Sequence, residues 1–275
     1  MRFASFIVKL MLLAGPPDKN AVLSLPVTAR AGAEVWPLQP EHMEATCDGR
    51  PLPPNALRRI DAPISIGLVL QPTTYLHEHI ADVQAAIRVF LGQIRPGDEL
   101  FTVNSLERPA LGVGFTSDPG AIVSSVALPD IKRRPHLYQG MDFALGYLEN
   151  ARNLNRALLV ILAGDDAGSV TAAEAVKART LTAHVPTYVV SLHVRKPDEL
   201  TEIAIDSGGE IWEVPNSNQL PEVMNEVRIR PGYLLDLHPA EQCRPADTHV
   251  LMLRCNPGVA HNGVSLHYQH KVPAH

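Results

Sequence analysis

The sequence predicts an α/β fold, in which a doubly wound, mostly parallel sheet is flanked by helices and a small β layer is made by the two ends of the chain. Two apolar runs indicate the sheet, residues 64–70 (ISIGLVL) and 157–162 (ALLVIL). A short, continuous run of this kind is typical of a central strand buried on both faces. As far as residue 227, strand-like and helix-like segments alternate, which favours parallel strands joined by helical crossovers.

Composition indicates an ordinary folded protein. Hydrophobic residues make up 45% and charged residues 19% of the 275-residue chain, so global disorder is not expected. The net charge is -5, and Lys and Arg are scattered apart from the run at residues 132–134, which argues against a nucleic-acid partner. No apolar stretch reaches the ~18 residues that a membrane-spanning helix needs.

Residues 1–20 form an uncertain leader. Arg2 followed by apolar residues resembles an export signal, which would make the protein periplasmic or secreted. Lys9 interrupts the apolar run, and Pro16 follows the small-residue pair where cleavage would occur. Export and retention therefore both stay open.

Residues 21–60 are expected to form an amino-terminal β segment. Pro26 suits an edge position in the first strand, because proline cannot donate to a β ladder. Asp48 and Gly49 predict a hairpin turn. The prolines at 51, 53 and 54 then predict a stiff linker into the main domain.

Residues 61–230 are expected to form the α/β domain. The apolar patterns predict strands at residues 64–70, 100–103, 111–115, 157–162, 187–192 and 210–214. Helical periodicity and capping residues predict helices at residues 79–94, 118–126, 137–148, 171–184, 197–206 and 218–227.

Residues 231–275 return to extended segments separated by turns, and we expect them to pack with the amino-terminal segment. The chain has three cysteines and no C-x-x-C spacing, which disfavours a zinc cluster. Cys243 and Cys255 could form a disulfide across a hairpin in an oxidising compartment, or remain buried thiols.

A polar cluster follows the first apolar run. Gln71, Thr73 and Tyr75 lie where residues 64–70 end. In open α/β sheets, ligands bind outside the carboxyl ends of the strands, at the point where the strand order reverses. These three residues are therefore the first candidates for a binding site.

Several segments in order resemble a von Willebrand factor type A domain, in the variant common in acidobacterial genomes. They are PISIGLVL, IRPGDELFTVNS, FTSDPGAI, LYQGMDFAL and RALLVILAGDDAGS. The resemblance extends over residues 21–273 and implies a Rossmann-like fold. It also implies a bacterial, non-enzymatic domain of the adhesion or protein-interaction kind, with another protein as partner; we expect no cofactor, because this chain departs from the family's metal site as described next.

The resemblance implies a metal-ion-dependent adhesion site, but this chain departs from its pattern. The family has D-x-S-x-S after the first strand, a Thr before the helix at 137–148 and an Asp after 157–162. Here Gln71, Tyr75, Pro135 and Ala163 stand at these positions, and only Thr73 keeps its hydroxyl. Mg²⁺ requires hard oxygen ligands with neutralising charge. We therefore expect no metal there, and recognition through loop shape, through Tyr75 or Tyr138, and through hydrogen bonds from Thr73 and Gln71.

Two alternatives remain. Asp165 and Asp166 could rebuild a cation site with Thr73, although Asp166 or Ser169 could instead cap the helix at 171–184. The same sheet edge could also serve a hydrolase. The sequence contains no G-x-S-x-G elbow and no P-loop, so neither motif supports an enzyme.

Overall fold

The computed structural model describes residues 23–31, 34–35, 37–52, 54–126, 135–166, 168–192, 197–229, 232–237, 249–255, 264–269 and 271–272. Structural statements below concern these residues. None of the helices among them is long and apolar enough to cross a membrane. The uncertain leader at residues 1–20 lies outside the described part.

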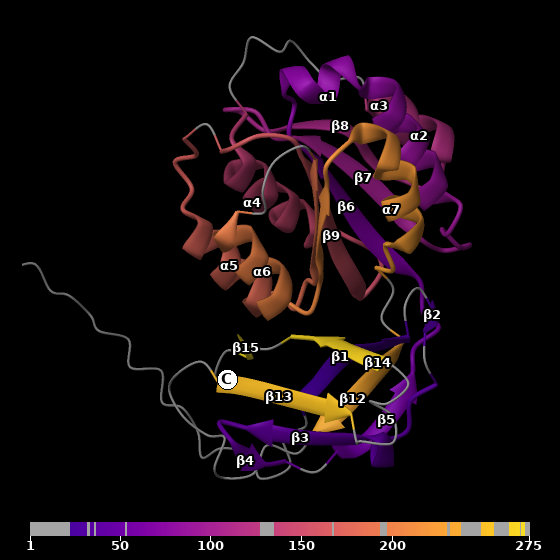
Figure 1. The fold of residues 1–275 in the computed structure, drawn as a ribbon, viewed down its shortest axis with the longest axis vertical. Helices are drawn as coiled ribbons and strands as arrows, with labels where there is room; N and C mark the ends of the chain where they lie inside the picture. Colours follow the sequence, from indigo (N-terminus) through magenta and orange to yellow (C-terminus); the bar gives the residue numbers. More distant parts are fainter. Residues whose placement is uncertain are drawn as a thin grey trace, which may run out of the picture.

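A six-stranded sheet forms the centre of the α/β body (Figure 1). In spatial order its strands are β11 (Ile211–Val214), β10 (Thr187–Leu192), β9 (Asn155–Leu162), β6 (Ile64–Leu70), β7 (Glu99–Asn104) and β8 (Ala110–Thr116). All neighbours are parallel except β8, which runs antiparallel to β7 at one edge. Every residue of β6 is buried, as its continuous apolar run predicted.

Helices cover both faces of this sheet. They are α1 (Thr74–Glu78), α2 (Ile80–Leu91), α3 (Pro119–Ser125), α4 (Leu137–Leu148), α5 (Ala173–Thr182), α6 (Asp198–Asp206) and α7 (Leu220–Glu226), with 3-10 turns η1 (Pro40–His42) and η2 (Ser217–Gln219). Side chains of α2, α3 and α7 fill one apolar core, and those of α4, α5 and α6 fill the other. The prediction of a doubly wound, mostly parallel sheet is confirmed.

The two ends of the chain form a β sandwich beside the α/β body (Figure 1). One sheet has the order β14 (Val264–Tyr268), β1 (Leu23–Ala31), β12 (Tyr233–Leu237) and β5 (Pro54–Arg59), with β2 (Glu34–Val35) also paired to β1. The other has the order β15 (Lys271–Val272), β13 (His249–Cys255), β3 (Met43–Cys47) and β4 (Arg50–Pro51). Side chains from both sheets share one buried core, so the predicted β layer is confirmed and consists of two facing sheets.

Two predictions from prolines are wrong in this region. The stretch read as a linker belongs to the sandwich, because Pro51 ends β4 and Pro54 begins β5, where a bulge opposite Leu237 accommodates it. Strand β1 is not at an edge, since β12 and β14 flank it. Its pairing with β14 begins only at Val27, however, so Pro26 has a ladder partner on one side alone.

The possible disulfide between Cys243 and Cys255 does not form, and of the two alternatives the free thiol holds for Cys255. Cys255 is a free thiol whose pKa is raised by burial, whereas Cys47 is disulfide-bonded. Cys255 and Cys47 do not meet, because they lie at opposite ends of the pair formed by β13 and β3. Cys255 lies opposite Met43, and Cys47 lies opposite Leu251. Cys243 lies outside the described residues.

The α/β body and the sandwich contact each other through Gln269, which is 3% exposed. Its backbone bridges to Ser207 at the end of α6. Its side-chain amide donates to the carbonyl oxygen of Leu181 at 3.1 Å, and its side-chain oxygen lies 2.8 Å from Nδ1 of His184. The carboxyl-terminal segment is thereby attached to the end of α5.

Candidate functional site

The candidate site lies at the carboxyl ends of the central parallel strands, which we call the carboxyl edge. Gln71 follows β6, Ala163 follows β9, and Asn104 ends β7. Because β6 lies between β7 and β9, the loops that leave these strands are neighbours. The structure thus brings most of the predicted site residues to one edge.

Gln71 is fully buried and ties two of these loops together. Its side-chain amide donates to the carbonyl oxygen of Asp165 at 3.1 Å, and its side-chain oxygen accepts from the backbone N–H of Ala163, also at 3.1 Å. Both ends of the amide are therefore used inside the protein. Because Gln71 is buried, its side chain supports the loops, and the expected hydrogen bond from Gln71 to a partner has no exposed group to make it.

Thr73 and Tyr75 begin a short helix that the sequence analysis did not predict. The hydroxyl oxygen of Thr73 accepts from the backbone N–H of Leu76 at 3.3 Å, which makes Thr73 the N-cap of α1. Tyr75 is half-buried, and its ring lies 4.4 Å from that of His79 at a tilt of 43°. A Thr just before TYLHE was the available signal for this helix.

Asp166 is the most heavily hydrogen-bonded side chain at this edge. One carboxylate oxygen accepts from the backbone N–H of Leu137 and from the hydroxyl of Ser169, both at 2.7 Å. The other oxygen accepts from the backbone N–H groups of Ser169 and Gly168, at 2.7 and 3.3 Å. Burial opposes ionisation, but these hydrogen bonds outweigh it and lower the pKa of Asp166.

The expected role of Asp166 as the cap of the helix after residue 171 is wrong. Helix α5 begins after Ala172, which makes no side-chain capping bond. Asp166 instead binds the first N–H of α4, 29 positions earlier in the sequence. It therefore holds the loop after β9 against the start of α4.

The remaining predicted residues provide few polar groups. Ala163 is buried and has no side-chain oxygen, and Pro135 pairs through its backbone with Leu106. Asp165 is exposed, and its carboxylate makes no hydrogen bond or ion pair with the described residues. Tyr138, in α4, is half-buried, and burial, with smaller contributions from Glu199 and Asp166, raises its pKa to about 12.

Sequence reasoning missed two polar residues at this edge. The side-chain oxygen of Asn104 and Nδ1 of His136 are buried and have no hydrogen-bond partner in the described chain. Such atoms in native proteins are commonly satisfied by an ordered water. Asn104 follows the predicted strand at 100–103, so the rule that selected Gln71 would also have found it, whereas His136 only precedes a predicted helix and that rule does not select it.

Few side-chain oxygens at the carboxyl edge are left to bind a metal ion. Mg²⁺ needs an octahedron of oxygens with compensating charge, but Gln71 and Asp166 have committed their oxygens internally, and Thr73 caps α1. Among the described residues, Asp165 and Glu107 at this edge have exposed carboxylates that form no hydrogen bond or ion pair. Across the residues whose placement is given, no three His, Cys, Asp or Glu side chains form a group that could hold a metal.

A cluster of Ser217, His79 and Asp82 lies near the same edge but does not form a hydrolytic triad. The hydroxyl of Ser217 donates to Asp82 at 2.6 Å, and the same oxygen lies 3.0 Å from Nδ1 of His79. A nucleophilic serine gives its proton to an imidazole that lies between it and the acid. Here the proton points at the carboxylate, so the cluster joins η2 to α2 without activating the serine.

Comparison with solved structures shows the fold. Proximal thread matrix protein 1 from the mussel byssus matches 65% of this chain at a TM-score of 0.55 and 14% identity, over 50% of its own length. A form of that protein with a zinc-occupied metal-ion-dependent adhesion site matches at 0.54 and 13% identity, with coverages of 62% and 46%. A von Willebrand factor type A protein from Catenulispora acidiphila matches at 0.52 and 12% identity, with coverages of 75% and 48%.

The chain therefore spans about half the length of these structures. No protein-family model matches the sequence, and neither does any curated protein sequence. The structural likeness shows that the α/β body has the von Willebrand factor type A fold, which confirms that part of the prediction.

Proposed function

We propose that this chain is a non-enzymatic interaction domain whose von Willebrand factor type A fold recognises a partner protein at the carboxyl edge without a bridging metal ion. The observation that supports the proposal is that the polar side chains at this edge form their hydrogen bonds within the protein. Gln71 and Asp166 use their side-chain oxygens to hold the loops, where a metal-binding relative would present them to an ion.

The surface above these loops has features suited to a protein partner. Val170 is 87% exposed beside the Asp166 turn, and Asp165 presents an unengaged carboxylate. Tyr75 adds a half-buried aromatic ring on α1. Aromatic and exposed apolar side chains beside a charge are common in protein interfaces. Val170 was not predicted, because an isolated valine in a loop has no periodic signal.

Site-specific photo-crosslinking in the producing cell tests the proposal. A photoreactive residue at Val170 should capture a discrete protein, and a chelator should not change the yield. The matched control is Leu154, which is 95% exposed but precedes β9 at the opposite edge. Equal capture from both positions, or capture abolished by the chelator, would contradict the proposal.

Metal titration supplies a second test. A ligand that binds only the folded state raises the melting temperature, by an amount that grows with its concentration above Kd. Mg²⁺ or Mn²⁺ should therefore leave the melting temperature unchanged. A saturable rise in differential scanning calorimetry would overturn the claim of a metal-free edge.

A relocated cation site is the second candidate, and the unengaged carboxylate of Asp165 is the observation in its favour. If metal does raise the melting temperature, Asp165→Ala should abolish that rise while leaving the metal-free protein intact. A rise that survives this substitution would place the ion elsewhere.

A further inference from the structure

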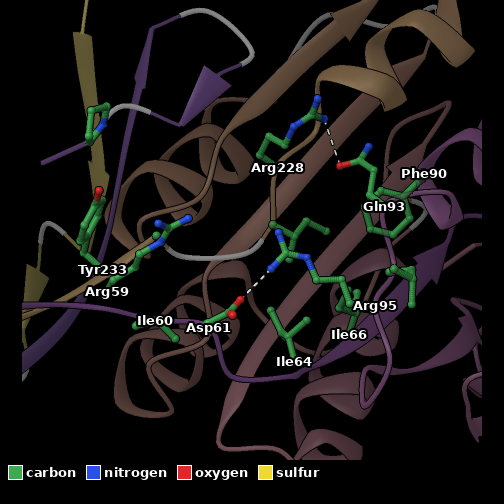
Figure 2. A pocket seen from close by; sticks show the side chains of 14 residues that line it. Arg59, Ile60, Asp61, Ile64, Ile66, Phe90, Gln93, Arg95, Arg228 and Tyr233 are labelled. Atoms are coloured by element: carbon green, nitrogen blue, oxygen red, sulfur yellow. Dashed lines mark hydrogen bonds and ion pairs between the residues drawn. The ribbon is translucent and has the colours of Figure 1, made fainter.

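A cavity of about 450 Å³ lies between the α/β body and the β sandwich (Figure 2). Its walls come from β5 and β12 of the sandwich and from β6 and α2 of the body. Ile64, where β6 begins, lines the cavity, whereas the carboxyl edge lies beyond Leu70. The two sites are thus separated by the length of β6, about 20 Å. A volume of this size falls within the range of small-molecule sites, about 300–1,000 Å³.

The inner wall of the cavity is apolar. Ile64 and Ile66 of β6, Phe90 of α2 and Ile229 are each 2–3% exposed, and Ile94 packs partly buried against the same core. A hydrocarbon chain placed against these side chains would lose its contact with water, which is favourable in proportion to the area covered.

The rim of the cavity is cationic. Arg59, Arg95 and Arg228 line it, and Asp61 is the one acidic residue among the lining side chains. Arg95 pairs with Asp61 at 2.9 Å, and Arg228 donates to the side-chain oxygen of Gln93 at 3.0 Å (Figure 2). The rim thus carries two positive charges in excess, although the chain as a whole has a net charge of -5.

The side chain of Arg59 forms no hydrogen bond or ion pair with the described residues, in contrast to its neighbour Arg58, whose guanidinium forms two hydrogen bonds to Asp236. In Figure 2, Arg59 lies beside Tyr233 on the sandwich side of the cavity. A guanidinium group presents its donors in a planar fork that matches a carboxylate. The cavity therefore combines an apolar wall with a cationic group available for a ligand.

We propose that this cavity binds an aliphatic monocarboxylate, with its hydrocarbon chain against Ile64, Ile66 and Phe90 and its carboxylate at Arg59. Such a ligand has a hydrocarbon part that matches the apolar wall and a negative charge that matches the cationic rim. A cationic amphiphile would meet the excess positive charge, and a short carboxylate would fill little of the cavity. The proposal is independent of the interaction at the carboxyl edge.

Isothermal titration calorimetry of the full chain with decanoate tests the proposal. Decanoate should bind one per chain with saturable heat, while decylamine and acetate should not bind measurably. Because the charge pair is partly exposed, added salt should weaken decanoate binding. The absence of saturable heat, or equal binding of decylamine, would overturn the proposal.

Substitution at Arg59 localises the binding. Arg59→Gln should weaken decanoate about tenfold, the effect of losing a hydrogen bond to a charged group, and Arg59→Lys should recover part of the loss. The side chain of Arg59 forms no such bond with the described residues, so the variant should melt like the parent. The control is Arg108→Gln, which removes the same charge from the exposed β7–β8 connection. Unchanged affinity in Arg59→Gln, or an equal loss in Arg108→Gln, would overturn the assignment.

Discussion

At the scale of single residues, Asp166 shows how one side chain can connect two segments that are distant in the sequence. Its carboxylate accepts four hydrogen bonds and joins the loop after β9 to the first turn of α4. Charge-assisted bonds of this kind, together with a capping position, are worth roughly 1–2 kcal/mol of folding free energy. We therefore expect Asp166 to contribute to stability.

Asp166→Asn should lower the free energy of unfolding by about 1–2 kcal/mol at neutral pH, because the amide can accept on one oxygen only. Urea denaturation measures this loss. Asp165→Asn is the matched control, since the neighbouring carboxylate makes no bond with the described residues, and it should unfold as the parent does.

The same substitution should alter the pH dependence of stability. The pKa of Asp166 is lowered in the folded protein, so its contribution is present above the unfolded pKa of about 3.9 and is lost as pH falls through the folded value. The stability difference between the parent and Asp166→Asn should therefore shrink below about pH 4. A difference that stays constant through the acid range would show that the carboxylate charge is not responsible.

At the scale of secondary structure elements, the position of α4 depends on a close approach at Gly140. A Cβ atom there would lie 2.3 Å from Cβ and 2.8 Å from Cα of Ser105, just after β7. Ser105 cannot move freely, because its hydroxyl and its backbone N–H both donate to the carbonyl oxygen of Leu70. The helix can therefore approach the sheet edge only through a glycine.

Gly140→Ala should lower the free energy of unfolding by about 1–3 kcal/mol, the usual cost of overpacking, even though alanine favours helices. Gly146→Ala in the same helix is the comparison, because its Cβ would meet the guanidinium of Arg179, a long side chain that can shift at the expense of its partly exposed ion pairs with Asp142 and Glu149. Chemical denaturation of both variants separates the two effects. Equal stability of the two would show that the contact at Ser105 relaxes without cost.

The elements also show what could be predicted from sequence. The strands at residues 64–70 and 157–162 were predicted well, because burial on both faces leaves an uninterrupted apolar run. Helix α1 was missed because five residues are too few to show a helical period. The bond from Asp166 to Leu137 joins positions 29 apart, and local capping rules relate only near neighbours. The hydrogen bonds of Gln71 to Asp165 and Ala163 likewise join positions more than 90 apart in the sequence, so no local rule predicts them.

At the scale of the whole molecule, Gln269 couples the sandwich to the α/β body. Its amide group is buried against Leu181 and His184. Gln269→Ala should leave the carbonyl of Leu181 without this donor and cost about 1–3 kcal/mol. Calorimetry should show a lower melting temperature, and hydrogen exchange should rise at the end of α5.

Gln219→Ala is the control for this prediction, since that exposed side chain makes no hydrogen bond with the described residues. If Gln269→Ala melts like the control and exchange near α5 is unchanged, the contact is not what holds the two parts together.

The pairing of β1 with β12 and β14 has a consequence for biosynthesis. Strands β12 and β14 are translated about 200 residues after β1. At roughly 5–20 residues per second this is a delay of about 10–40 s. The α/β body is complete on the nascent chain before the sandwich can close. During that interval the first strands must wait with unsatisfied backbone edges, so a ribosome-associated chaperone that shields them should raise the yield of native protein.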